Sequence, residues 1–184
     1  GASLHRRKHV RGGAITQLLM DRGLGAAGVA IDWVPPKGIL LLPLSTNLAL
    51  TPALLNPRTL RGTFLFTFKQ WWRVFANTLT ESEARAAYHA QAIPAPGRAI
   101  FQAALANFTP NATTTVNFQN PTRAPLLFIG GEKDVIMPAS LSRKIFRKHR
   151  VSSRVTDYKE FPGRSHYIIA EQGWEEVEDY GLAW

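Results

Sequence analysis

Apolar residues recur along much of this 184-residue chain at the spacing of amphipathic helices. In residues 12–21, for example, Ile15 and Leu18 fall on one face of a helix that Gly23 would end. Thr80 and Glu83 have the spacing of a capping box and so start another helix. That helix runs through about residue 91, and further helices are predicted at residues 68–79, 96–107, 140–149 and 174–181.

Three short segments, two of them apolar and one alternating, predict strands. Residues 125–130 are continuously apolar, which is typical of a parallel strand covered on both faces. Residues 26–33 form a similar run, and residues 154–161 alternate between polar and apolar positions. Because strands and helices alternate along the chain, we predict an α/β fold with a parallel sheet flanked by helices.

The first two strands are separated by residues 38–120, a segment too long for an ordinary crossover. Prolines divide residues 38–63 into loop and broken helix, and the rest of the segment has helical spacing. We therefore predict a mostly helical cap insertion at 38–120, placed over one end of the sheet. The core of the fold is then formed by residues 1–37 and 121–184.

Composition narrows the possible functions. The chain has no cysteine, which excludes a disulfide framework, thiolate metal ligands and a cysteine nucleophile. It has no run of about 18 apolar residues, so no membrane span is expected. No long apolar segment follows the basic residues 6–8, so no signal peptide is expected either. A cytoplasmic location is the expectation, with secretion left open.

The net charge is +9, and the densest basic runs lie at residues 6–11 and 143–150. A nucleic acid or another anionic surface is one interpretation of these runs. A basic tail and a solvated helix face are the other interpretation. We favour it because the aromatics do not interleave with either run in the way that a base-stacking surface requires.

Candidate chemistry follows the last two predicted strands. Asp134 lies in the loop after residues 125–130, and His166 lies in the loop after residues 154–161. Ligands of open α/β sheets bind beyond the carboxyl ends of the strands, so these two loops should meet there. A buried acid that orients an imidazole is the arrangement of a hydrolytic triad. We therefore expect the side chains of Asp134 and His166 to lie within hydrogen-bond reach.

These motifs resemble a known family. The sequence Gly-Gly-Glu-Lys-Asp-x-x-x-Pro at residues 130–138, followed by Gly-x-Ser-His-Tyr at 163–167, is similar to the last third of the α/β-hydrolases of the esterase, lipase and haloperoxidase-like kind. The resemblance covers roughly residues 8–184. It implies that Asp134 is the triad acid and His166 the general base, and it implies no cofactor and no metal.

The chain departs from this family at the nucleophile. Aligned with the family's elbow motif Gly-His-Ser-x-Gly-Gly, the residues Lys8-His9-Val10-Arg11-Gly12-Gly13 place Val10 where the serine should be. A valine side chain has no atom that can attack a carbonyl. Ser3 is a less well placed alternative, because four basic residues separate it from the helix that follows. A complete fold of this kind needs roughly 250 residues, so we expect a truncated or inactive relative of serine ester hydrolases.

A non-catalytic module that binds an apolar ligand in a cap pocket is the alternative function. The partner implied is a small apolar ester or acid. Its predicted contacts are Trp33, Trp71, Trp72 and Phe75, although each of these aromatic residues also suits plain packing of cap on core. The apolar strand at 26–33 would lose its usual neighbour and become an edge, which predicts self-association through that strand.

Overall fold

The computed structural model describes residues 11–40 and 43–184. Three parallel strands form its central sheet, in the order β1 (Gly28–Ile31), β4 (Leu126–Gly131) and β5 (Thr156–Phe161). The register pairs Gly28 with Leu126 and Gly131 with Phe161. The predicted parallel sheet flanked by helices is confirmed.

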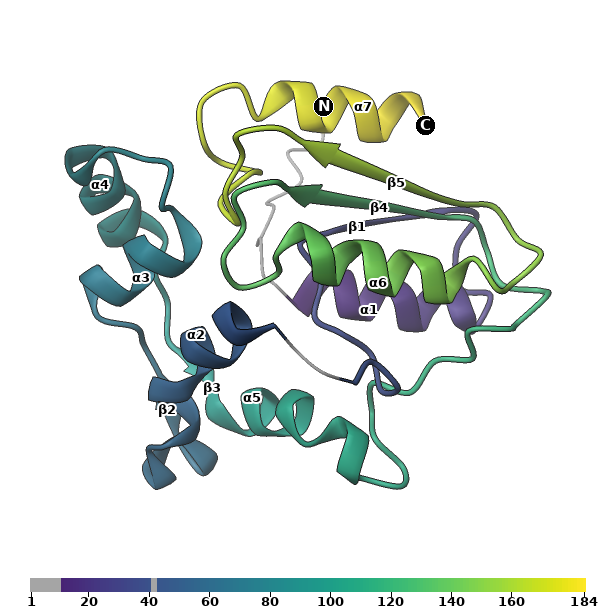
Figure 1. Ribbon diagram of the computed structural model, residues 1–184, viewed down its shortest axis with the longest axis horizontal. Helices are drawn as coiled ribbons and strands as arrows, with labels where there is room; N and C mark the ends of the chain where they lie inside the picture. Colours follow the sequence, from purple (N-terminus) through teal and green to yellow (C-terminus); the bar gives the residue numbers. More distant parts are fainter. Residues whose placement is uncertain (1–10, 41–42) are drawn as a thin grey trace.

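The helices of the core lie on both faces of this sheet. They are α1 (Arg11–Asp21), α6 (Ala139–His149) and α7 (Glu175–Ala183). Figure 1 shows α7 on one face and α1 and α6 on the other. The apolar run of β4 explains this layering, because Leu126 and Phe128 join the core cluster under α1 and α6, whereas Leu127 and Ile129 join the cluster under α7. A strand buried on both faces needs apolar residues at every position.

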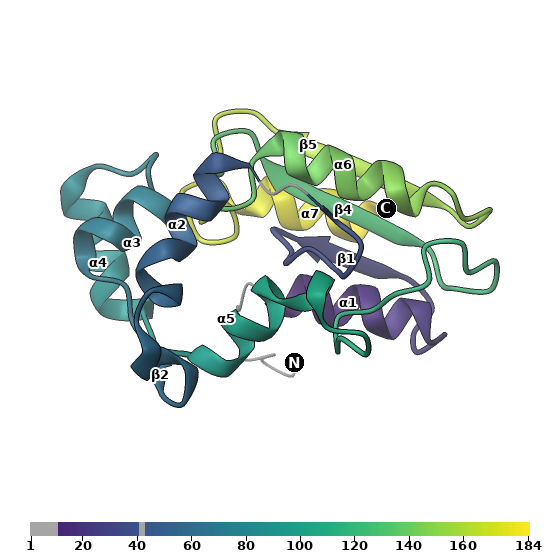
Figure 2. The same ribbon diagram turned by 60° about the horizontal axis from the view of Figure 1, so that its bottom comes forward.

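Between β1 and β4 the chain forms a separate group of short elements. They are α2 (Leu44–Leu54), the 3₁₀ helix η1 (Pro57–Leu60), β2 (Thr63–Phe64), α3 (Phe68–Phe75), α4 (Glu81–Gln91), β3 (Ala95–Pro96), α5 (Gly97–Ala104) and the 3₁₀ helix η2 (Ala106–Phe108). Figures 1 and 2 both place α3 and α4 beyond the carboxyl ends of β4 and β5. The boundaries predicted for a cap insertion, which would begin at residue 38 and end at residue 120, stay predictions.

The structure corrects several predicted boundaries: the helix expected at 68–79 ends at Phe75, and the strand expected at 154–161 begins at Thr156. The strand expected at 26–33 is only four residues long, because Gly25 (φ 135°) lies in a turn before it and Asp32 (φ 44°) leaves the strand conformation after it. The capping box of Thr80 and Glu83 is present, and α4 begins at Glu81 as predicted. The small antiparallel pair β2–β3 was not predicted, since two-residue strands leave no periodicity.

Within the described ranges β1 pairs with β4 alone and so forms one edge of the sheet. Association of two copies through this edge stays a prediction, which light scattering at micromolar concentration checks. Among the helices that the structure describes, none combines the length and the apolar character needed to cross a lipid bilayer.

Candidate active site

The acid of the predicted pair lies in the turn that joins β4 to α6. Asp134 is buried, and one carboxylate oxygen, Oδ1, accepts hydrogen bonds from the backbone N–H of Ile136 at 2.9 Å and of Met137 at 2.7 Å. These bonds satisfy two backbone donors just before α6 begins at Ala139. The carboxylate therefore has a fixed orientation, with its second oxygen, Oδ2, turned toward the loop after β5.

That second loop is attached closely to the first. The backbone N–H of Lys133 donates to the carbonyl of Arg164 at 2.8 Å, and the Glu132 carboxylate accepts from the backbone N–H of Gly163 at 2.8 Å. Gly131 permits this approach, because a Cβ at that position would lie 2.4 Å from the Arg164 carbonyl oxygen. Contacts of the backbone therefore hold the His166 loop against the turn that carries Asp134.

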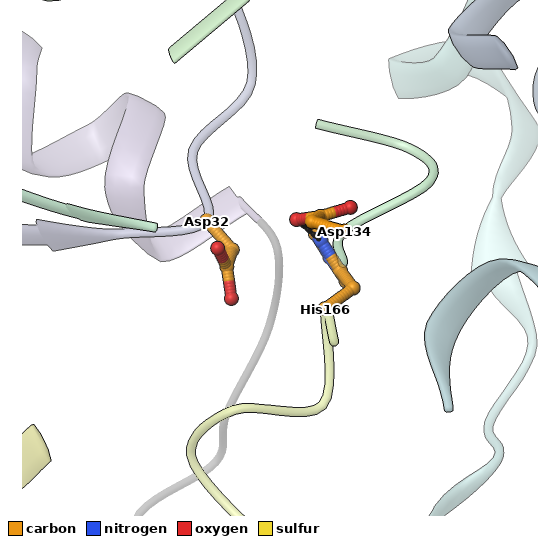
Figure 3. Close-up of side chains that lie close together, drawn as sticks. All are labelled: Asp32, Asp134 and His166. Carbon is orange, nitrogen blue, oxygen red and sulfur yellow. Dashed lines mark hydrogen bonds and ion pairs between the residues drawn. The ribbon is translucent and has the colours of Figure 1, made fainter. Parts of the chain in front are cut away.

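His166 completes the pair. Its Nδ1 lies 2.6 Å from Oδ2 of Asp134, and both side chains are buried (Figure 3). The predicted hydrogen-bond contact is present. Because a carboxylate can only accept, Nδ1 carries a proton, and in the neutral ring Nε2 then keeps its lone pair. An imidazole in this tautomer is equipped to act as a base through Nε2.

Glu171 fixes the His166 loop from the other side. Its carboxylate accepts from the backbone N–H of Ser165 at 3.1 Å and from the Thr78 hydroxyl at 2.8 Å. Thr78 lies between α3 and α4, so this buried acid joins the His166 loop to that connection. No sequence motif marks Glu171, because its partners lie 6 and 93 residues away.

A third acid lies beside the pair, and the sequence analysis did not select it. Asp32 directly follows β1, is 4% exposed, and neither oxygen of its carboxyl group has a hydrogen-bond partner. Burial raises the pKa of Asp32 well above its usual value, and the nearby charge of Asp134 raises that pKa further. One ligand atom from each of Asp32, Asp134 and His166 lies within 4.8 Å of the others.

A mostly apolar cavity of about 330 Å³ lies close to the pair, because Phe75 both lines it and packs on the His166 ring. Its lining comes from α1, from the segment after β1 and from elements between β1 and β4, and includes Ile15, Pro36, Leu50 and Ile100. The Phe75 ring is also packed edge-on against the His166 ring, with 5.1 Å between their centroids. Phe75 therefore separates the imidazole from the cavity by one side chain.

Backbone contacts connect the acid to the same cavity. Ile136 and Met137, whose backbone N–H groups bind Asp134, also line it. A wider groove of about 600 Å³ lies between α4 and the loop after β5, but its lining mixes Glu83, Arg164 and Glu171 with small apolar groups. The narrower cavity is thus the one suited to an apolar ligand.

Of the four aromatic residues expected to contact a ligand, only Phe75 lines the apolar cavity. Trp33 is fully buried against Phe128, because α1 approaches so closely at Gly13 that a Cβ there would lie 2.4 Å from Trp33 Cβ. Trp33 thus takes the alternative interpretation, packing in the core, in this structure, and a ligand contact at Trp33 stays a prediction.

The other two tryptophans also serve packing. The ring of Trp71 is buried and lies 5.5 Å from that of Tyr167, so it joins α3 to the His166 loop. Trp72 donates from its indole Nε1 to the carbonyl of Leu79 at 3.0 Å and stacks on Phe68. Which residues of an aromatic helix face a cavity depends on how the helix docks, and helical spacing alone does not determine it.

The basic run on α6 is largely used within the fold. Lys148 donates to the carbonyl of Gly38 at 2.7 Å, Lys144 donates to the carbonyl of Leu40, and Arg143 pairs with Glu160. These contacts favour the interpretation of the run as a solvated helix face. The other basic run, at residues 6–11, lies almost entirely outside the described residues. The candidate nucleophile positions Val10 and Ser3, with Lys8 and His9, also lie outside them.

Comparison with known proteins supports this fold. No protein-family model matches the chain, and no curated protein matches it in sequence. A provisionally assigned non-heme bromoperoxidase, BpoC, from Mycobacterium tuberculosis H37Rv is similar in structure, with a TM-score of 0.61 and 18% identity, over 94% of this chain and 63% of that one. The monoacylglycerol lipase of Paleococcus ferrophilus has a TM-score of 0.53 and 17% identity, over 92% and 62%. Polyneuridine aldehyde esterase has a TM-score of 0.57 and 12% identity, over 95% and 69%.

These structures share the α/β-hydrolase fold, and this chain has that fold over the part it spans. The resemblance stated from the motifs at 130–138 and 163–167 is thereby confirmed at the level of the fold. The chain spans about three-fifths of the length of the first structures it matches, at 63% and 62%. At these identities the likeness concerns architecture alone.

Proposed function

We propose that this chain carries the acid and base of a serine ester hydrolase-like site, and that it does not hydrolyse esters in the form given. The buried contact of 2.6 Å between Asp134 Oδ2 and His166 Nδ1 is the observation that carries the proposal. In a hydrolytic site this arrangement orients the imidazole and stabilises its protonated form. Asp134 is then the triad acid and His166 the general base.

The similar structures support the same class of reaction, since two of them are a monoacylglycerol lipase and an esterase. The substrate proposed here is accordingly a small apolar ester. Its apolar part would occupy the cavity of about 330 Å³, with the ester near Phe75, the side chain shared by the cavity and the His166 ring. No cofactor takes part in this chemistry.

Val10 is the reason for proposing inactivity. The motif alignment places it in the nucleophile position, and its side chain offers no atom for a covalent step. A base without a nucleophile retains only a small part of the catalytic acceleration. The cavity favours a second candidate function, in which the chain binds an apolar ester or acid without converting it.

An assay with a short-chain chromogenic ester tests the first part. We expect no turnover above background for the wild-type chain and the same result for His166→Ala. Turnover that His166→Ala abolishes would contradict the proposed inactivity, and it would point to Ser3 or another nucleophile.

Titration with a fluorescent fatty acid tests the binding role. We expect saturable binding at one site per chain, and loss of that binding in Ala103→Trp, which fills the cavity from α5. Ala90→Trp is the matched control, because Ala90 is exposed on α4 and does not line this cavity. Equal affinity in Ala103→Trp and Ala90→Trp would place the ligand elsewhere and contradict the binding role.

A further inference from the structure

Helix α2 has an apolar stripe that no other part of the described chain covers. Leu44, Leu48 and Leu55 are 73%, 55% and 78% exposed. Leu55 directly follows α2 and continues its helical backbone, so the spacing of four and seven residues places all three side chains on one face. Thr46 and Leu50 lie on the opposite face and line the apolar cavity. Single exposed leucines are normal on a protein surface, but a row of them marks an interaction site.

The chain around this leucine stripe is basic and lacks acids. No aspartate or glutamate occurs between Asp32 and Glu81, whereas five lysines and arginines do. Arg58 lies in η1, which contacts α2, and Arg61 directly follows η1. Both side chains are exposed, and within the part of the chain that the structure describes neither forms an ion pair. Positive charge next to the leucine stripe is complementary to an anionic surface.

A lipid bilayer with anionic headgroups fits both properties of this surface. Apolar side chains of a surface helix insert below the headgroups, while nearby lysines and arginines attract anionic lipids. A protein partner fits less well, because the residues that dominate protein–protein binding are enriched in Trp, Tyr and Arg, and leucine is under-represented among them. Helix α2 itself contains no aromatic and no charged residue.

We propose that the leucine stripe of α2 docks this chain on the surface of an anionic lipid bilayer, with Arg58 and Arg61 at the level of the headgroups. The chain lies on the membrane in this arrangement and does not cross it. Because the opposite face of α2 lines the apolar cavity, docking brings that wall of the cavity next to the lipid. No residue of the Asp134–His166 pair takes part, so membrane binding is independent of any conversion of esters.

Flotation of the whole chain with lipid vesicles tests the docking. We expect binding to vesicles of phosphatidylcholine and phosphatidylserine in equal parts, and at least about ten-fold weaker binding when Leu44→Ser is combined with Leu48→Ser. The matched control is Leu182→Ser on α7, which should bind as tightly as the wild type. Leu182 is 78% exposed, but its helix is rich in acids, which anionic lipid repels.

A second pair of changes tests the charges. Arg58→Gln combined with Arg61→Gln should weaken binding to the anionic vesicles about ten-fold, and the wild type should bind pure phosphatidylcholine vesicles less tightly than anionic ones. No binding of the wild type to anionic vesicles, equal binding to both kinds of vesicle, or equal binding of the double serine variant and Leu182→Ser would overturn the proposal. So would a wild-type dimer that the double serine variant converts to a monomer in the absence of lipid, because a second copy would then cover the leucine stripe.

Discussion

Asp134 and Asp32 occupy equivalent places at the ends of neighbouring parallel strands, but their surroundings differ. Both carboxyl groups are buried, at 3% and 4% exposure. The turn after β4 supplies Asp134 with two backbone N–H groups and the His166 ring. The segment after β1 supplies Asp32 with no hydrogen-bond donor.

The difference shows that a position at the carboxyl end of a strand does not by itself make a carboxylate functional. Backbone donors fix the orientation of the Asp134 carboxylate, which lets it orient an imidazole. Burial favours the neutral form of Asp32 instead, and together with the nearby charge of Asp134 it raises the pKa of Asp32. One acid is thus built to hold a histidine, and the other to hold a proton.

Replacing the well-supported acid should have the largest effect. We expect Asp134→Ala to lower the free energy of unfolding by about 3 kcal/mol, because two backbone N–H groups and the His166 ring lose their buried acceptor. Urea denaturation at pH 7 measures this loss. Asp179→Ala, an exposed acid, is the control and should change little. Equal losses in the two variants would mean that the three bonds to Asp134 contribute nothing.

Replacing Asp32 should raise the free energy of unfolding, whereas replacing Asp134 should lower it. Because the pKa of Asp32 is raised in the folded chain, the folded state keeps a proton that the unfolded state has released. The contribution of Asp32 to the free energy of unfolding should therefore fall as the pH rises from about 4, the ordinary pKa of aspartic acid, up to the raised pKa.

Asp32→Asn removes this titration. In metal-free buffer we expect it to be as stable as the wild type near pH 4 and about 1 kcal/mol more stable at neutral pH. Urea denaturation at several pH values measures the difference. A difference that stays constant over that range would show that Asp32 does not titrate with a raised pKa.

The smallest effect is expected for an exposed acid in the turn that also carries Asp134. Glu132 lies two residues before Asp134, but its carboxylate faces solvent, where it accepts from Gly163 and pairs with Lys133. These hydrogen bonds lower the pKa of Glu132. We expect Glu132→Gln to leave Tm almost unchanged, since solvent screens the charge. A Tm loss as large as that of Asp134→Ala would remove the distinction between buried and exposed acids.

The comparison also shows what the sequence could predict. The apolar run of β4 and the motif that follows it were enough to select Asp134, and the same reasoning after β5 selected His166. Asp32 was missed because the apolar run at 26–33 placed it inside a strand, whereas β1 ends at Ile31. An acid near the end of an apolar run was the signal that could have identified it.

The choice between ligand contact and core packing at the aromatic residues depends on tertiary structure. Trp33 faces the core because α1 packs on it at Gly13, a contact between segments that local periodicity does not report. In α3 the spacing predicted an aromatic helix correctly, but docking alone decides that Phe75 faces the cavity while Trp71 meets Tyr167. Helix and strand order follows from local patterns, and the lining of a site follows from packing.

The central claim is that Asp134 holds His166 in the tautomer of a base. Nitrogen NMR of the histidine rings in the wild type and in Asp134→Asn measures this directly. In the wild type we predict a proton on Nδ1 of His166 and a lone pair on Nε2, because Asp134 accepts from Nδ1. In Asp134→Asn the amide can donate to Nδ1, so the proton should move to Nε2. The same tautomer in both proteins, or a proton on Nε2 in the wild type, would contradict the account.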